Sequence, residues 1–148
     1  MGFRDRAAKE ANLATARQSD HFELIDADLR YDDIESLVHG VDVVFHQAAQ
    51  PGVRLSWSEG FADYVGHNVL ATQRLLEAVK ATTSAKVVYA SSSSVYGNAP
   101  SYPTTEEDLP RPHSPYGVTK LAAEHLCNLY AANWNVHTVA LRYFTVYG

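Results

Sequence analysis

Tyr116 and Lys120 are two residues whose types and spacing could move a proton together. They lie four residues apart in HSPYGVTK (113–120), so on a helix they share one face. A phenol is a poor base at neutral pH because its pKa is near 10, but a nearby ammonium favours the phenolate. Lowering the phenol pKa by about 3 corresponds to roughly 4 kcal/mol of differential stabilisation.

A run of serines offers a third group for this chemistry. The stretch ASSSSVYG (90–97) supplies hydroxyls that could share a proton with Tyr116. A Ser–Tyr–Lys constellation of this kind would take a proton from an alcohol while hydride leaves its carbon. The Tyr-x-x-x-Lys spacing alone is common, so a core or surface tyrosine beside a solvated lysine is the alternative. For the serines the alternative is a flexible linker.

Helical and strand signals alternate along the chain and would position these groups. Acids precede the segment at 32–40 and Gly40 ends it, which is typical of a helix. Ser114 is a suitable N-cap, with Pro115 at the first helical position. The patterns predict helices at 4–18, 32–40, 61–83 and 115–134, and strands in 22–29, 42–52, 85–97 and 135–148, the last three running into loops.

Short apolar strands that alternate with helices predict an α/β fold with a doubly wound parallel sheet covered on both faces. Four unusual stretches each follow the C-terminal end of a predicted strand. Ligands bind at this edge of an open parallel sheet. The stretches that meet there are ADL (27–29), HQAAQPG (46–52), ASSSSVYG (90–97) and RYFTVYG (142–148).

The composition of the chain excludes several classes of partner. The 148 residues carry a formal net charge of -5, which disfavours nucleic acid and anionic membrane. There is no apolar run near the ~20 residues of a membrane span, and the charged N-terminus does not look like a secretory signal. The single cysteine, Cys127, favours a reducing, cytoplasmic location. The seven histidines lack metal-ligand spacing, so no metal site is expected.

The ordered motifs resemble those of a known family. ASSSSVYG, SPYGVTK and LRYFTVYG, preceded by HQAAQPGVR and NVLATQRLLEAV, are similar to motifs of the extended short-chain dehydrogenases/reductases, in the NAD-dependent epimerase/dehydratase group. The resemblance runs from about Asn12 to Gly148 and is greatest to UDP-glucuronate and UDP-glucose 4-epimerases. It implies a Rossmann-like fold, NAD as cofactor and a nucleotide sugar as substrate.

The resemblance also implies roles for individual residues. Tyr116 resembles the base, and Lys120 the residue that lowers its pKa and holds the nicotinamide ribose, with the cationic ring acting in the same direction. Ser92, four residues before Tyr96, matches the catalytic hydroxyl. The residues implied to bind cofactor are Asp28, Leu29, Ala48, Ala49, Asn68, Ser91, Tyr116, Lys120 and Tyr143, and those implied to bind substrate are Ser92, Ser94, Tyr116 and Thr145.

The residues after Ser92 distinguish between the reactions of this family. Dehydratases place Asp-Glu there, and decarboxylases tend to have Glu at the position of Ser94, whereas here both positions are serine. Hydroxyls suit an epimerase. RYFTVYG resembles UDP-glucuronate 4-epimerases, and UDP-glucose 4-epimerases more often have Asn at the position of Thr145. Arg54 could help to bind an acidic sugar or could be a loop arginine facing solvent. A UDP-glucose 4-epimerase, a related dehydratase or decarboxylase, and a non-catalytic nucleotide-binding module are the alternatives.

The sequence departs from the family pattern in one respect. The Gly-x-x-Gly-x-x-Gly turn that binds the dinucleotide pyrophosphate is absent. We therefore expect residues 1–148 to be an incomplete Rossmann domain without the C-terminal substrate domain, a fragment that alone binds NAD poorly and does not turn over. The family also leads us to expect a homodimer through the helices at 61–83 and 115–134.

Overall fold

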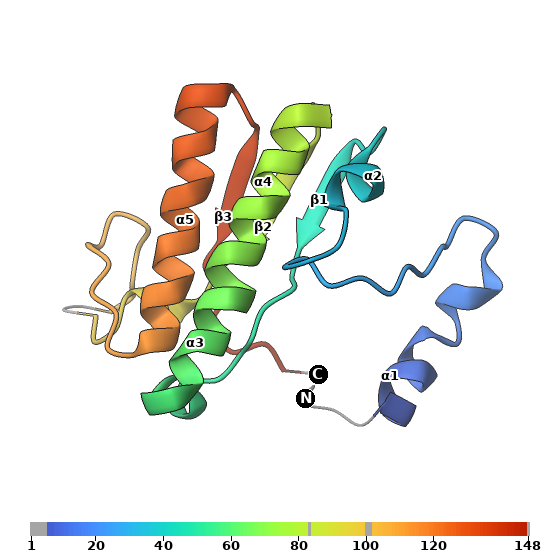
Figure 1. Ribbon diagram of the computed structural model, residues 1–148. Helices are drawn as coiled ribbons and strands as arrows, with labels where there is room; N and C mark the ends of the chain where they lie inside the picture. Colours follow the sequence, from blue (N-terminus) through green and yellow to red (C-terminus); the bar gives the residue numbers. More distant parts are fainter. Residues whose placement is uncertain (1–5, 83, 100–101, 148) are drawn as a thin grey trace.

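The computed structural model describes residues 6–82, 84–99 and 102–147. Its sheet has the strand order β1 (Val43–His46), β2 (Lys86–Ala90) and β3 (Thr138–Leu141). Both pairings are parallel, with Val44 opposite Val87 and Val87 opposite Thr138. Helical segments connect the strands, so the predicted α/β fold with a parallel sheet is confirmed (Figure 1).

The predicted helices are present with modified boundaries. The segment at 4–18 forms α1 (Arg6–Leu13) and the turn η1 (Ala16–Gln18), and the segment at 32–40 forms α2 (Ile34–Val38). The segment at 61–83 divides into α3 (Phe61–Tyr64), a π-helical turn η4 (Val65–Leu70) and α4 (Ala71–Thr82). The remaining helical elements are η2 (Arg54–Ser56), η3 (Ser58–Gly60), η5 (Ser93–Val95) and α5 (Pro115–Trp134). Predicted positions 4, 5, 83 and 148 lie outside the described residues.

Helix α5 begins and ends where the local chemistry requires. The Ser114 hydroxyl accepts a hydrogen bond from the Gly117 N–H at 3.0 Å, which satisfies one of the free N–H groups of the first turn. Pro115 follows at the first helical position, where its missing N–H is harmless. Asn135 adopts φ 55° and terminates the helix in the left-handed region. The start of α5 therefore fixes the place of Tyr116.

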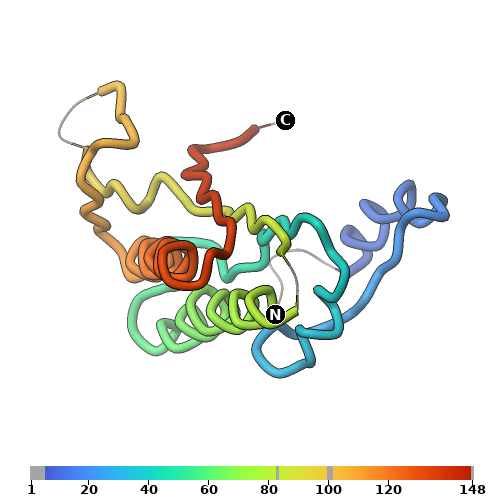
Figure 2. Tube along the Cα trace, turned by 90° about the horizontal axis from the view of Figure 1, so that it is seen from above, coloured from blue at the N-terminus to red at the C-terminus, as the bar shows by residue number. Residues whose placement is uncertain are grey.

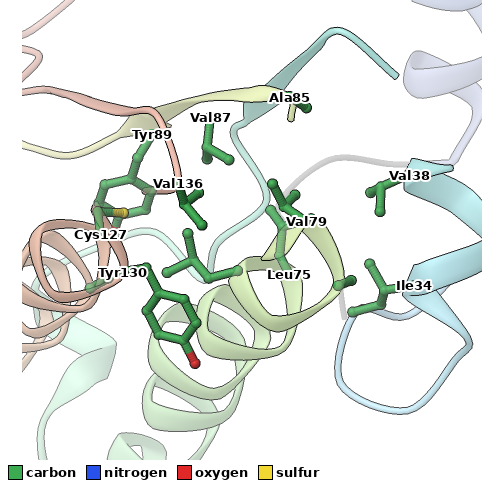
Figure 3. Packing of buried hydrophobic residues seen from close by; sticks show 13 residues of the cluster. Ile34, Val38, Leu75, Val79, Ala85, Val87, Tyr89, Cys127, Tyr130 and Val136 are labelled. Atoms are coloured by element: carbon green, nitrogen blue, oxygen red, sulfur yellow. The ribbon is translucent and has the colours of Figure 1, made fainter. Parts of the chain in front are cut away.

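Helices α4 and α5 lie side by side over one face of the sheet (Figures 1 and 2). Their apolar side chains meet those of β2 in a buried core that includes Leu76, Val79, Val87, Tyr89 and Cys127 (Figure 3). Full burial of an aliphatic or aromatic side chain contributes about 1.5–3 kcal/mol. This core holds the C-terminal end of β2 against the middle of α5, where the serine loop and Lys120 meet.

The opposite face of the sheet differs from the expectation of two covered faces. Phe45 is 69% exposed, and Val43, Val139 and Leu141 are also exposed. In the described part of the chain, α1 lies to one side and no helix packs over these residues (Figures 1 and 2). The described helices therefore cover one face of the sheet.

The predicted strand at 22–29 is wrong for this structure. Residues 22–28 are irregular, and the side chains of Leu24 and Ile25 are exposed. A strand needs a neighbour to pair its N–H and C=O groups, and no described strand pairs with this segment. The β-branched and apolar residues supply the propensity but not the partner.

Candidate functional site

The serine loop and the first turn of α5 are in direct contact. Ser92 caps the turn η5, where its hydroxyl accepts a hydrogen bond from the Ser94 N–H at 3.1 Å. A Cβ at Gly117 would lie 2.6 Å from the Ser94 carbonyl oxygen, so only glycine permits this approach. The contact brings Ser92 close enough to Tyr116 to act on the pKa of its phenol. Two of the three predicted catalytic residues thus lie near each other.

Tyr116 is held as a neutral phenol in this structure. Burial raises its pKa, the hydrogen bond with Ser92 opposes that rise, and the neighbouring Tyr64 adds to it. The two rings meet edge to face with centroids 6.1 Å apart. The Tyr64 hydroxyl donates to the carbonyls of Pro51 and Gly52, at 2.9 and 2.7 Å. Desolvation of the phenolate dominates here, and the lowering of this pKa by Lys120 together with the nicotinamide stays a prediction.

Lys120 lies one helical turn further along α5 and is 4% exposed. Its ammonium donates to the Ala90 carbonyl at 2.8 Å and lies over the Tyr89 ring, 5.0 Å from the centroid. Burial lowers the pKa of Lys120 to about 8. The lysine therefore joins the C-terminal end of β2 to the face of α5 that carries Tyr116.

Asn68 links the loop after β1 to the first turn of α5. Its Oδ1 accepts from the Gln50 N–H at 2.7 Å, and its Nδ2 donates to the Gln50 carbonyl at 3.2 Å and to Thr119 Oγ1 at 3.0 Å. Thr119 in turn donates to the Tyr116 carbonyl at 2.8 Å. Asn68 lies in the π-helical turn η4, a distortion that is frequent at functional sites. The asparagine thus ties the loop, as its match to the family implies.

His46 is buried below this network and hydrogen-bonds Thr72. Thr72 donates its single hydroxyl hydrogen to the Asn68 carbonyl at 2.7 Å, so His46 Nε2, 2.8 Å away, must be the donor to Thr72 Oγ1. Burial, with a smaller contribution from Lys120, lowers the pKa of His46 to about 4. His46 is therefore a neutral imidazole protonated on Nε2 at pH 7.

A hollow of about 440 Å³ lies at the C-terminal edge of the sheet beside β1. The Arg30 guanidinium binds the Asp28 carboxylate at 2.7 Å and holds its pKa well below the usual range. Arg74 on α4 donates to the carbonyls of Leu29 and Asp32, at 3.0 and 2.9 Å, which fixes this loop. The hollow is lined by Asp26, Ala27, Asp28, Leu29, Asp32, Ala48, Ala49 and His67, four of which are predicted cofactor-binding residues.

The remaining predicted residues are distributed differently. Ser91 is buried and donates its hydroxyl to Glu124, which also forms an ion pair with Arg142 at 2.9 Å. Ser94 is half-buried in the serine loop, next to the first turn of α5. Tyr143 accepts from the Ser93 N–H at 2.8 Å through its carbonyl, so the end of β3 lies beside the serine loop. The side chains of Tyr143 and Thr145 are exposed, and neither is brought against Tyr116.

The structure adds residues that the sequence did not single out. Thr119 connects Asn68 to Tyr116, and Glu124 joins Ser91 to Arg142. Glu124 follows Lys120 by four residues, so the shared helix face was a usable signal. Tyr89 under Lys120 gave no such signal, because an aromatic residue in an apolar strand reads as core. His67, which lines the hollow, could not be distinguished from a surface histidine.

Metal-binding clusters and helices able to span a membrane are absent from the described residues. Within the described residues, no group of three or more His, Cys, Asp or Glu side chains could hold a metal ion. Among the described helices, none is both long and apolar enough to cross a bilayer.

These features define a Rossmann-type α/β fold, with the serine loop and the first turns of α5 beside the C-terminal end of β2. Residues 3–148 match the model of the NAD dependent epimerase/dehydratase family. The chain belongs to this family.

Several relatives are similar to the chain over most of its length. The uncharacterized UDP-glucose epimerase YtcB of Bacillus subtilis is 46% identical over 140 residues, which are 95% of this chain and 44% of that protein. The UDP-glucose 4-epimerase of Mycolicibacterium smegmatis is 37% identical, over 100% of this chain and 48% of its own.

A solved structure is also similar to the chain over its whole length. The UDP-glucuronic acid 4-epimerase from Bacillus cereus, in complex with UDP-glucuronic acid and NAD, superposes with a TM-score of 0.95 at 44% identity. The superposition covers 100% of this chain and 47% of that one. The chain spans about half the length of the relatives it matches.

Proposed function

We propose that the chain supplies the catalytic half of an NAD-dependent nucleotide-sugar 4-epimerase, in which Ser92, Tyr116 and Lys120 handle the proton of the C4 hydroxyl. The observation that carries the proposal is that the serine loop packs against the first turn of α5, which holds Tyr116, while Lys120 on the same helix is anchored on Ala90 at the end of β2. The family and the 4-epimerases among its relatives support it. We also propose that the 148 residues form part of an NAD-binding domain in a cytoplasmic protein.

The residues present fit part of an NAD molecule. Asp28 and Leu29 present a hollow of about 440 Å³ at the strand ends, and the small side chains of Ala48 and Ala49 leave room there for an adenosine. Lys120 donates one of its three N–H groups to Ala90, and the others are suited to a ribose hydroxyl. Bound NAD would supply the hydride acceptor for sugar C4 and the donor for its return.

The side chains of the chain would then perform the acid–base steps. Tyr116 Oη takes the proton from the C4 hydroxyl and later gives it back to the oxygen of the 4-keto sugar. Ser92, which lies near Tyr116, would share this proton through its hydroxyl. Lys120 adds positive charge, which favours the phenolate. Since Tyr116 is a neutral phenol in the structure, the base forms only when further positive charge reaches the site.

We propose UDP-glucuronate as the preferred sugar, with UDP-glucose as the second candidate. The 44% identity to the Bacillus cereus UDP-glucuronic acid 4-epimerase supports the first, and the UDP-glucose epimerases among the relatives support the second. Arg54 lines a separate hollow of about 570 Å³ with Gln50 and Tyr64, and the ring of Tyr64 also contacts that of Tyr116. A guanidinium there would favour a carboxylated sugar.

The proposal can be tested in a chimera. Residues 1–148 would replace the matching segment of the Bacillus cereus enzyme, which aligns over their whole length. Conversion of UDP-glucuronate and of UDP-glucose would be followed by NMR of the anomeric protons. We expect conversion at C4 with UDP-glucuronate preferred. A folded, NAD-loaded chimera that converts UDP-glucose faster would contradict the substrate proposal, and one that converts neither sugar would contradict the function.

We further propose that the complete protein forms a homodimer through α3, α4 and α5. Phe61 and Val65 on the first helical stretch and Val118 and Leu129 on α5 are exposed apolar residues. Phe61 and Val118 line a shared apolar hollow with Trp57, at the N-terminal ends of α3 and α5. Exposed apolar area of this kind favours association.

A further inference from the structure

The environment of Lys120 is unusual for a buried cation. The side chain is 4% exposed, and in the described part of the chain its ammonium forms no salt bridge. Its hydrogen-bond acceptor is a neutral carbonyl, that of Ala90. A buried charge is costly unless it is compensated, so another group must stabilise this ammonium.

The ring of Tyr89 is the group that stabilises the Lys120 ammonium. Its ring lies under the Lys120 ammonium at 5.0 Å, within the range in which the negative face of an aromatic ring attracts a cation. Tyr89 directly precedes Ala90, so the end of β2 provides both contacts to the ammonium. The attraction is strongest where water is excluded, and Tyr89 is 1% exposed.

The Tyr89 hydroxyl does not explain the presence of this residue. Among the described residues, it is a buried side-chain oxygen without a hydrogen-bond partner. An unpaired buried hydroxyl destabilises a protein. The ring packs in the core beside Cys127 (Figure 3) and leaves its face to Lys120. The ring of Tyr89, and not its hydroxyl, therefore makes the contact with the Lys120 ammonium.

We propose that Tyr89 is a positioning residue whose ring keeps the Lys120 ammonium charged and directed along the C-terminal edge of the sheet. Tyr89 acts through Lys120 and does not contact substrate. The consequence for turnover rests on the proposed function, whereas the effect on the charge of Lys120 does not.

Other ionisable groups near Lys120 must be considered in any test. His46 on β1 is neutral at pH 7, because burial holds its pKa far below that pH. Tyr116 and Glu124 lie on α5 itself, and Glu124 is paired with Arg142. Neither His46 nor Tyr116 changes charge near pH 8, where burial places the pKa of Lys120. The titration of Lys120 can therefore be read separately.

The test is an NMR titration of lysine side chains in the 148-residue chain, with a Lys120→Arg variant to assign the signal. Position 89 would carry Phe and then Phe rings with increasing fluorination, which weakens the negative ring face while nearly keeping its shape. We expect Tyr89→Phe to leave the pKa of Lys120 nearly unchanged. The pKa should then fall stepwise, by about 1 at the pentafluoro ring.

Two further variants complete the experiment. Tyr89→Leu should lower the pKa of Lys120 as much as the pentafluoro ring, whereas Tyr130→Leu, which removes another core tyrosine, should not. A flat fluorination series would overturn the proposal, as would equal shifts from Tyr89→Leu and Tyr130→Leu. If Tyr89→Leu does not fold, the fluorinated series alone decides. Because no substrate is used, the result is independent of whether the chain proves to be an epimerase.

Discussion

At the scale of single residues, the side chains of the site are already in place, but Tyr116 is not yet a phenolate. Ser92 lies near Tyr116 and lowers the pKa of its phenol, and Lys120 is anchored on Ala90. Burial nevertheless raises the pKa of Tyr116 and lowers that of Lys120 to about 8, so desolvation disfavours both charged forms. The protein thus positions these side chains before a ligand binds. The phenolate requires positive charge that arrives with a ligand.

His46 gives a pH-dependent prediction at the same scale. Burial lowers its pKa from 6.5 to about 4, so below pH 6.5 the unfolded chain binds a proton that the folded chain refuses. Stability is therefore present above pH 6.5 and is lost as the pH falls toward 4. Between pH 7 and pH 5 we expect the free energy of unfolding to fall by about 2 kcal/mol. Urea unfolding measured at both pH values would show this.

A His46→Gln variant is the control for this prediction. Glutamine does not titrate, so the loss between pH 7 and pH 5 should be much smaller in the variant. Asp28 and Glu77 have lowered pKa values too, but their contribution is lost only near and below pH 4. An equal loss of stability in the variant and the original chain would contradict the assignment to His46.

At the scale of elements, the contact between the serine loop and α5 determines the geometry of the site. This contact depends on Gly117, because a Cβ there would meet the Ser94 carbonyl oxygen at 2.6 Å and Pro112 Cβ at 2.9 Å. Both neighbours belong to segments that are themselves held in place by hydrogen bonds or ring geometry. The loop and helix must therefore separate if the glycine is replaced.

Replacement of Gly117 by alanine tests this contact. We expect Gly117→Ala to lower the free energy of unfolding by about 1–3 kcal/mol, although alanine favours helix. Gly66→Ala is the matched control, since a Cβ there would lie 3.5 Å from Arg30 Cδ, an ordinary contact. Thermal unfolding of both variants gives the comparison. A Gly117→Ala variant as stable as Gly66→Ala would show that the loop does not depend on this close approach.

The sequence predicts the elements that are defined by local chemistry. Ser114, Pro115 and the helical pattern after them predict α5, and the apolar runs predict all three strands of the sheet. The segment at 22–29 could not be judged from its own residues, because a strand depends on a partner. The π-helical turn around Asn68 and the ring of Tyr89 under Lys120 arise from tertiary contacts, which local pattern does not encode.

At the scale of the whole molecule, exposed apolar side chains of the described residues lie both on the helices and on the sheet. Those on the helices include Phe61 and Val118, and those on the open sheet face include Phe45 and Val139. The chain spans about half the length of the relatives it matches. The two surfaces can be distinguished by experiment.

The proposed dimer predicts different effects of charge on these surfaces. In the chimera, Val118→Glu should convert a dimer to a monomer, because it places a charge in the apolar contact of α5. Phe45→Glu should leave the dimer intact, since the sheet face lies away from α5 (Figure 2). Light scattering after size exclusion gives the mass of each variant. Dissociation by Phe45→Glu but not by Val118→Glu would place the interface on the sheet.

The proton-transfer role of Tyr116 is the central claim, and its hydroxyl is the atom to remove. Tyr116→Phe keeps the ring against Tyr64 and should leave the fold and NAD content of the chimera unchanged. The rate of C4 conversion of UDP-glucuronate, measured by NMR, should fall by about 10²–10⁴-fold, as expected for the loss of a general acid–base group. A Tyr116→Phe chimera that converts the sugar at the original rate would contradict the account.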